Sequence, residues 1–410
     1  MKIWMKYLIG ALLGAAIALV VPAGDAALKA TLGFLFDLSI RIGRYALVPL
    51  ILFSVPVAVF ELNEDKEFWR VLGRIMLVLL ASVAAFALIG VATASLVRPA
   101  RIPLLADAAP SASTLDLKGL LLAVFPESLF SIFASSGSFL LPVYFFAVLL
   151  GLAFSFDKTA TRPVLSLVDS LSRIFYQINS FFAEFLGVLV ITATAYNVLK
   201  FRSELRVDVY GPLLLLVGIE VLVMALGVIP AVLYFAVGKK NPYRVLYALL
   251  APSLAALVSG DVYFPLGSLM KHAKESLGIR RRINGLVLPL AVLFGRAGTA
   301  LVTTTAFIVV LSSYSGLGIS VGSLAWILAA APLLTLLLGA SPGRGAMTAL
   351  TALCALYGRG FENGYLIVAP IALPLVAAGA FLDTLWAGAA AVLVAKKTGQ
   401  MQEKEARFYI

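Results

Sequence analysis

The sequence predicts an all-α polytopic membrane protein. Of its 410 residues, 61% are apolar and only 13% are charged, and the mean hydropathy is +1.02. Soluble domains are roughly half apolar and about a quarter charged, so membrane lipid must surround much of this chain. The apolar runs are long and continuous rather than alternating, and lipid-embedded backbone is satisfied only in helices or closed barrels. Helices are therefore expected, and the chain can hold roughly eight to ten spans of about 20 residues.

Charged clusters divide the chain into apolar segments that predict eight transmembrane helices. The expected ranges are 6–22, 31–60, 73–97, 119–155, 173–199, 209–237, 284–312 and 364–395. The fourth segment is interrupted by the small-residue patch ASSGS. The opening MKIWMK and its apolar run indicate a first span rather than a cleaved signal, because further apolar segments follow and no soluble domain does.

Two further apolar segments are broken near the middle by glycine, proline and serine. The first, 245–270, breaks at Ser259–Pro265, and the second, 323–357, breaks at Ser341–Gly345. Such breaks free backbone groups, so they are tolerated where they are buried in protein or line a cavity. Paired broken segments indicate two re-entrant helical hairpins around a binding site. Two ordinary kinked hairpins are the alternative.

Residue counts exclude several classes of protein. The single cysteine, Cys354, excludes an internal disulfide framework and a cysteine-based metal site. The single histidine, His272, lies in the charged run KHAKES and is expected to be a solvated loop residue. Juxtamembrane lysines and arginines explain the net charge of +11. The sequence has no basic stripe with interleaved aromatic residues, so nucleic-acid binding is not predicted. Their distribution predicts a cell-membrane protein with both termini in the cytoplasm.

Four stretches, spread over nearly the whole chain, carry a family resemblance. They are MKYLIGALLGAAIALV, INGLVLPLAVLFGRAGTAL, GASPGRGAMTAL and AGAAAVLVAKKTG. In order and character they resemble the dicarboxylate/amino acid:cation symporter family, which includes glutamate and aspartate transporters. The resemblance implies a homotrimer in which each protomer has a scaffold domain and a transport domain. The transport domain slides across the membrane as an elevator, and the two hairpins enclose a small anionic solute.

The resemblance also implies a division of the chain. Residues 1–72 hold helices one and two of the scaffold, and 73–118 hold helix three of the transport domain. Residues 119–237 hold helices four to six, which belong mostly to the scaffold, with helix six in the transport domain. Residues 238–396 hold hairpin one, helix seven, hairpin two and helix eight, which form the core of the transport domain, and 397–410 form a cytoplasmic tail.

At the positions that carry chemistry, the sequence departs from the family pattern. The family's Asn-Met-Asp-Gly-Thr signature falls on Gly295–Thr299, and its later sodium-ligand Asp falls on Ala387. Hard cations need several oxygen ligands, so sodium coupling is expected to be weakened or absent, and no metal or cofactor is predicted. The substrate-binding candidates lie at the two hairpin tips and on helices seven and eight: Ser259, Gly260, Asp261, Arg296, Thr299, Pro342, Gly343, Arg344, Gly379 and Asp383.

Arg296 and Asp383 are the charges that stand where family members hold cation ligands and substrate. A charge at mid-bilayer costs at least ~2.5–3.5 kcal/mol, so such groups usually pair or serve a function. One hypothesis makes Arg296 a tethered substitute for a coupling cation, paired with Asp383, and the other makes the pair a static staple. Arg344 or Arg296 is the candidate anion clamp, with a solvated Arg344 as the alternative. Asp261 could bind an amine, a proton or an arginine.

Two other features of the spans leave alternatives open. Glu220 lies deep within an apolar run, where it is either a proton-carrying carboxyl or a carboxyl hydrogen-bonded at a subunit contact. The pair Gly10 and Gly14 is typical of close helix packing.

Three functions compete on this sequence. The leading one is a secondary transporter for a small organic anion, either a dicarboxylate or an acidic amino acid. Val376 falls where the family's amino-group ligand lies, which favours an anion without an amino group. An anion-conducting channel is the second, and a membrane-embedded protein with another role is the third. An enzyme is not expected, because no HExxH, GxSxG, Walker or paired-carboxylate motif occurs.

Overall fold

The computed structural model is built of helices in the part of the chain that it describes. It describes residues 1–22, 25–103, 122, 124–128, 130, 132, 139–204, 207–238, 241–314, 319–338, 345–358, 360–402 and 404–410. The helices of the first half are α1 (Ile3–Val20), α2 (Ala26–Arg44), α3 (Leu47–Glu64), α4 (Phe68–Val97), α7 (Leu141–Ala153) and α8 (Lys158–Glu204). Those of the second half are α9 (Val207–Val223), η1 (Met224–Val228), α10 (Ile229–Val237), α11 (Tyr243–Ser259), α12 (Leu266–Glu275), α13 (Arg281–Phe294), α14 (Ala297–Tyr314), α15 (Val321–Leu337), α16 (Gly345–Tyr357), η3 (Gly364–Ile371), α17 (Ala372–Lys397) and η4 (Ala406–Phe408).

Within these described ranges, seven helical runs are long and apolar enough to cross a membrane. They are Ile3–Val20, Ala26–Glu64, Phe68–Val97, Lys158–Ser203, Asp208–Val237, Arg281–Tyr314 and Gly364–Lys397. The protein is therefore a polytopic helical membrane protein, as predicted. The predicted fourth span, 119–155, lies partly outside the described residues, and its described helix, α7, has 13 residues. The expected count of eight spans stays a prediction.

Several expected helices have different bounds in the structure. The single helix predicted over 31–60 is two helices, α2 and α3, which meet at a turn at Tyr45 and Ala46. The helix predicted over 173–199 is longer in the structure, where α8 spans Lys158–Glu204. Charged residues in its first part do not end the helix, because pairs such as Arg173 and Asp169 lie one turn apart on its surface and attract each other. The helix predicted over 209–237 contains one π-helical turn, η1, just before Pro230, which has no N–H for the regular ladder.

The helix predicted over 284–312 is also wrong as a continuous element. It ends at Phe294 and begins again at Ala297, so Gly295 and Arg296 lie between α13 and α14. The two helical hairpins occur where the sequence is broken. In the first, α11 and α12 are joined by 260–265. In the second, α15 and α16 pack together, and residues 339–344 lie outside the described residues.

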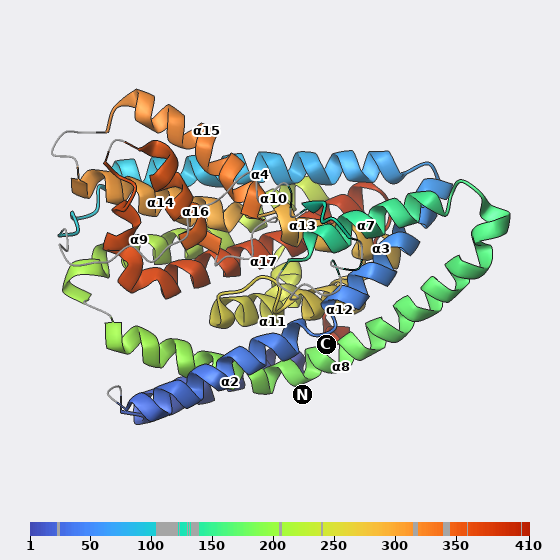
Figure 1. The fold of residues 1–410 in the computed structure, drawn as a ribbon, viewed down its shortest axis with the longest axis horizontal. Helices are drawn as coiled ribbons and strands as arrows, with labels where there is room; N and C mark the ends of the chain where they lie inside the picture. Colours follow the sequence, from blue (N-terminus) through green and yellow to red (C-terminus); the bar gives the residue numbers. More distant parts are fainter. Residues whose placement is uncertain are drawn as a thin grey trace.

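The helices form two packed groups. In the first, α1 and α2 lie along the long curved α8, which forms one edge of the molecule in Figure 1. A Cβ on Gly10 would overlap the carbonyl oxygen of Gly187 in α8, and one on Gly14 would overlap that of Ile191. The close packing predicted for this glycine pair is therefore confirmed. In the second group, α14 packs against α4, α16 and α17, and α17 also contacts α11 and α13.

The two ends of the chain lie close together (Figure 1). Both contact Tyr247 in α11: the indole Nε1 of Trp4 donates to its hydroxyl at 3.0 Å, and the ring of Tyr409 stacks on its ring at a centroid distance of 6.1 Å. The base of the first hairpin and both termini therefore share one side of the molecule.

Candidate functional site

The turn of the first hairpin is shaped by short polar residues. Gly260 ends α11 with φ +64°, in the left-handed region that glycine adopts without steric cost. The Ser259 hydroxyl donates to the Ala255 carbonyl at 2.7 Å and accepts from the backbone N–H of Asp261 at 3.2 Å. The Asp261 carboxylate accepts from the backbone N–H of Tyr263 at 2.9 Å. These contacts fix the direction in which Asp261 and Tyr263 leave the turn.

The break between α13 and α14 is stabilised from a neighbouring helix. The first N–H groups of a helix have no intrahelical partner and favour a negative charge. Asp383 of α17 supplies that charge, because its Oδ1 accepts from the backbone N–H of Thr299 at 3.0 Å and its Oδ2 accepts from the Thr299 hydroxyl at 2.6 Å. The approach requires Gly298, where a Cβ would overlap the Cβ of Leu382.

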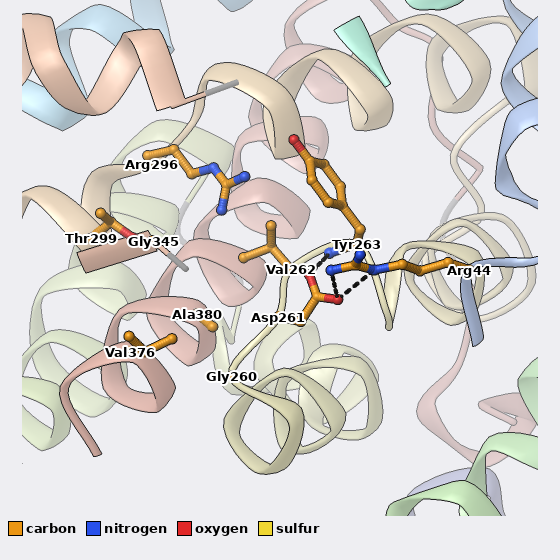
Figure 2. Close-up of a pocket in the computed structure, with 10 residues that line it drawn as sticks. All are labelled: Arg44, Gly260, Asp261, Val262, Tyr263, Arg296, Thr299, Gly345, Val376 and Ala380. Atoms are coloured by element: carbon orange, nitrogen blue, oxygen red, sulfur yellow. Dashed lines mark hydrogen bonds and ion pairs between the residues drawn. The ribbon is translucent and has the colours of Figure 1, made fainter. Parts of the chain in front are cut away.

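A small, partly open cavity of about 20 Å³ lies between the first hairpin and this helix break. Figure 2 shows the side chains that surround it, with the guanidinium of Arg296 directed toward Val262 and Tyr263. The described residues that line the cavity come from α2, the hairpin turn, α14, the start of α16, and α17: Arg44, Gly260, Asp261, Val262, Tyr263, Arg296, Thr299, Gly345, Val376 and Ala380.

Arg296 is the charge of this cavity that forms no direct ion pair among the described residues. Its side chain is buried, with 6% of the residue exposed, and its Nε has no hydrogen-bond partner in those ranges. Its Cζ lies 5.3 Å from the ring centroid of Tyr263, a cation–π contact. The expected ion pair with Asp383 is not formed, because that carboxylate is bound to Thr299 at the end of α14. Arg296 therefore offers a desolvated positive charge to the cavity.

A second arginine of the cavity is paired. The Nε of Arg44, at the end of α2, donates to the Asp261 carboxylate at 2.7 Å, and its Nη2 contacts the same oxygen. Its Cζ lies 5.8 Å from the ring of Tyr263. Of the three partners predicted for Asp261, an arginine is the one present, and the pair joins the first group of helices to the hairpin turn.

The structure brings four of the predicted site residues to the cavity wall: Gly260, Asp261, Arg296 and Thr299. Ser259 shapes the turn, and Gly379 and Asp383 lie behind Thr299. Pro342, Gly343 and Arg344 lie outside the described residues. Sequence reasoning missed Arg44 and Tyr263 as site residues, although an arginine inside an apolar segment is itself the signal of a buried partner.

A larger, apolar groove adjoins the cavity. It has a volume of about 790 Å³ and is lined mainly by aliphatic side chains of α8, α9, α11 and α17. Gly260 and Val376 line both the groove and the cavity. The charged cavity and the apolar groove are therefore neighbours that share these two residues.

Two titratable side chains lie away from the cavity. Glu220 is hydrogen-bonded within the chain, to Thr93 of α4 and Thr305 of α14. His272 is buried in α12 rather than solvated, with its Nδ1–H donating to the Ser268 carbonyl at 2.8 Å. The charged run around it misled the prediction, because Lys271 is neutralised by Glu184 of α8 at 2.8 Å.

The fold and cavity define a class, the polytopic helical membrane proteins with an internal charged site. The chain belongs to the sodium:dicarboxylate symporter family, whose sequence model matches residues 3–397. It is therefore a transport protein and not an enzyme, and the resemblance inferred from the sequence is confirmed.

Individual relatives agree with this assignment. A C4-dicarboxylate transport protein of Xylella fastidiosa (strain M12) is 25% identical over 319 residues, which cover 75% of this chain and 68% of the relative. A C4-dicarboxylate transport protein of Sinorhizobium medicae (strain WSM419) is 24% identical over 288 residues, covering 66% of this chain and 60% of the relative. A third, from Anaeromyxobacter sp. (strain K), is 25% identical over 335 residues, covering 74% and 69%.

Proposed function

We propose that this protein is a secondary transporter that carries a small organic anion, a C4-dicarboxylate or a close analogue, across the cell membrane. The observation that carries the proposal is the buried Arg296, which faces a small, partly open cavity and forms no direct ion pair among the described residues. A buried charge without a partner costs several kcal/mol in general, and a bound carboxylate would offset that cost. An arginine fork also matches a carboxylate geometrically.

The class of anion follows from two further considerations. The relatives described above are named C4-dicarboxylate transport proteins. Val376 lines the cavity, and Gly379 lies against Thr299, so neither position offers a carboxylate to a substrate amino group. A dicarboxylate without an amino group is therefore favoured over an acidic amino acid. Arg344, proposed from its place in the sequence, would bind the second carboxylate.

The proposed movement is an elevator. The group of α1, α2 and α8 would form the scaffold, and α4, α9, α13, α14 and α17 with the two hairpins would form the moving part. Both ends of the chain contact Tyr247, which supports a topology with both termini in the cytoplasm and the first hairpin entering from that side. We further propose that the hairpins are re-entrant and that three copies assemble around the scaffold.

Weak or absent sodium coupling is part of the proposal. Ala297 and Ala387, where the family resemblance implies sodium-ligand carboxylates, are fully buried methyl side chains. A sodium site needs several oxygen ligands, and these positions supply none from their side chains. The charge of Arg296 would replace part of the positive charge that a cation otherwise brings to the anion.

The test is uptake of radiolabelled succinate by purified protein in proteoliposomes, with and without sodium. We expect saturable uptake, weak dependence on sodium and a preference for succinate over aspartate. R296Q should lose uptake and R296K should retain a part, while R407Q, in the exposed tail, should match the parent protein. Equal uptake by R296Q would overturn the role of Arg296. A turnover far above that of carriers would favour a channel.

A further inference from the structure

We infer that Glu220 is a proton-binding site that moves with the transport group and couples anion movement to protons. The inference rests on the proposed function and extends it to the driving ion. Glu220 lies on α9 and is buried, with 3% of the residue exposed.

Two threonines from two other helices hold the carboxylate. The Thr305 hydroxyl of α14 lies 2.9 Å from Oε1 and 3.0 Å from Oε2, and the Thr93 hydroxyl of α4 contacts Oε1. All three side chains belong to helices of the proposed moving part. A proton bound here would therefore travel with the anion rather than be left behind at the scaffold.

Both protonation states of Glu220 can be satisfied by this arrangement. When the carboxylate is ionised, both hydroxyls donate to it. The Thr93 hydroxyl also lies 2.9 Å from the carbonyl oxygen of Ile89 and 3.2 Å from that of Gly90. After a proton binds to Oε1, the Thr93 hydroxyl can rotate so that it donates to a carbonyl of its own helix and accepts from the carboxyl O–H. The change of protonation state therefore requires only an exchange of hydrogen bonds.

No charged side chain compensates the carboxylate in the described part of the surrounding helices. α14 has no charged residue between Ala297 and Tyr314, and α4 carries Arg70 and Arg74 only in its first two turns. On α17, Asp383 is bound to Thr299, and the lysines are in its last turn. Since an uncompensated charge is costly in hydrocarbon, crossing the membrane with the neutral carboxyl is favoured.

The proton site is connected to the cavity by one helix. Thr299 lines the cavity and Thr305 binds Glu220, and both lie on α14. Six residues of helix separate them by roughly 9 Å. A bound anion and a bound proton would thus both contact α14 and could influence its position together.

The charge of the substrate explains why coupling to protons would favour uptake. Moving a dianion into a negative interior costs free energy for each charge carried. Each cotransported proton offsets one of these charges. A protein with few sodium ligands at the expected positions, and with a buried Glu220 that no charged side chain of the described helices compensates, has the means to use protons for this.

The test measures two partial reactions in the same proteoliposomes: exchange of labelled for unlabelled succinate at uniform pH, and net uptake driven by a pH gradient. We expect E220Q, which mimics the protonated state, to retain exchange and to lose gradient-driven uptake at least tenfold. An internal pH dye should show proton entry with succinate in the parent protein and none in E220Q. E405Q, in the exposed tail, serves as the control.

A second variant covers the case in which E220Q does not fold. T305V removes a donor to the carboxylate and should shift gradient-driven uptake toward higher pH. Undiminished gradient-driven uptake in E220Q, an unshifted profile in T305V, or a dependence on sodium instead of protons would overturn the inference. Absence of succinate exchange in the parent protein would instead overturn the proposed function.

Discussion

Asp383 of α17 accepts two hydrogen bonds from Thr299 of α14, one from its hydroxyl at 2.6 Å and one from its backbone N–H at 3.0 Å. The carboxylate therefore serves as a cap for a helix that is distant in sequence. Arg296 forms no direct ion pair with this carboxylate, and its guanidinium is directed toward Val262 and Tyr263 at the cavity (Figure 2).

We predict that loss of this cap destabilises the protein. Hydrogen bonds to charged groups contribute about 1.5–3 kcal/mol each, so D383A should lower the midpoint of thermal unfolding in detergent by several degrees. D383N keeps one acceptor oxygen and should lie between D383A and the parent protein. Intrinsic fluorescence during heating measures the midpoint, and equal midpoints for all three proteins would contradict the capping role.

Tyr263 should position Arg296 through its ring rather than its hydroxyl. The ring lies within 6 Å of the Cζ atoms of Arg296 and Arg44, while its buried hydroxyl has no hydrogen-bond partner in the described residues. Cation–π contacts contribute about 0.5–2 kcal/mol, so Y263L should weaken succinate binding roughly two- to thirty-fold. Y263F should bind within about twofold of the parent protein, and an equal loss in both variants would contradict this reading.

The Arg44–Asp261 pair should restrain the turn of the first hairpin. R44Q and D261N each remove the same contact, so each should raise the accessibility of the turn, and the double variant should add little. The single cysteine, Cys354, is buried, so a C354S background with V262C gives a clean site for labelling by a maleimide. R41Q, at an exposed position one turn earlier in α2, should leave the labelling rate unchanged. Additive effects of R44Q and D261N would show that the two residues act separately.

Gly14 should be intolerant of any larger side chain. Its Cβ would overlap the Ile191 carbonyl and approach the Thr194 Cβ within 2.7 Å, and overpacking typically costs about 1–3 kcal/mol. G14L should therefore lower the temperature at which the protein loses its monodisperse peak in size-exclusion chromatography. G218A, at a helical glycine with no atom within 4 Å of its Cβ, should retain the parent behaviour.

The helical fold and the hairpin breaks could be predicted because they depend on local sequence. Long apolar runs need lipid, and the residues between Ser259 and Pro265 cannot continue a helix comfortably. The break at Gly295 and Arg296 could not be found in this way. The apolar run continues on both sides, and the cap that stabilises the break comes from Asp383, which is 84 residues from Thr299.

The sequence predicted which residues belong to the site better than it predicted which of their side chains contact each other. Arg296 and Asp261 were recognised as charges in apolar surroundings, but sequence alone does not show which backbone N–H groups compete for a carboxylate. The pairing of Arg296 with Asp383 was wrong for that reason. Arg44 could have been found by asking which group neutralises an arginine between Ile42 and Leu47, since a buried arginine rarely lacks a partner.

The sharing of Gly260 and Val376 by the cavity and the groove has a consequence for inhibitor chemistry. An amphiphile with a carboxylate near Arg296 and an alkyl tail in the apolar groove would occupy both spaces at once. Such a compound would reach the protein from the lipid rather than from water, and its potency would rise with tail length until the groove is filled. Small diacids and lipid-soluble monoacids would then be mutually exclusive ligands of this protein.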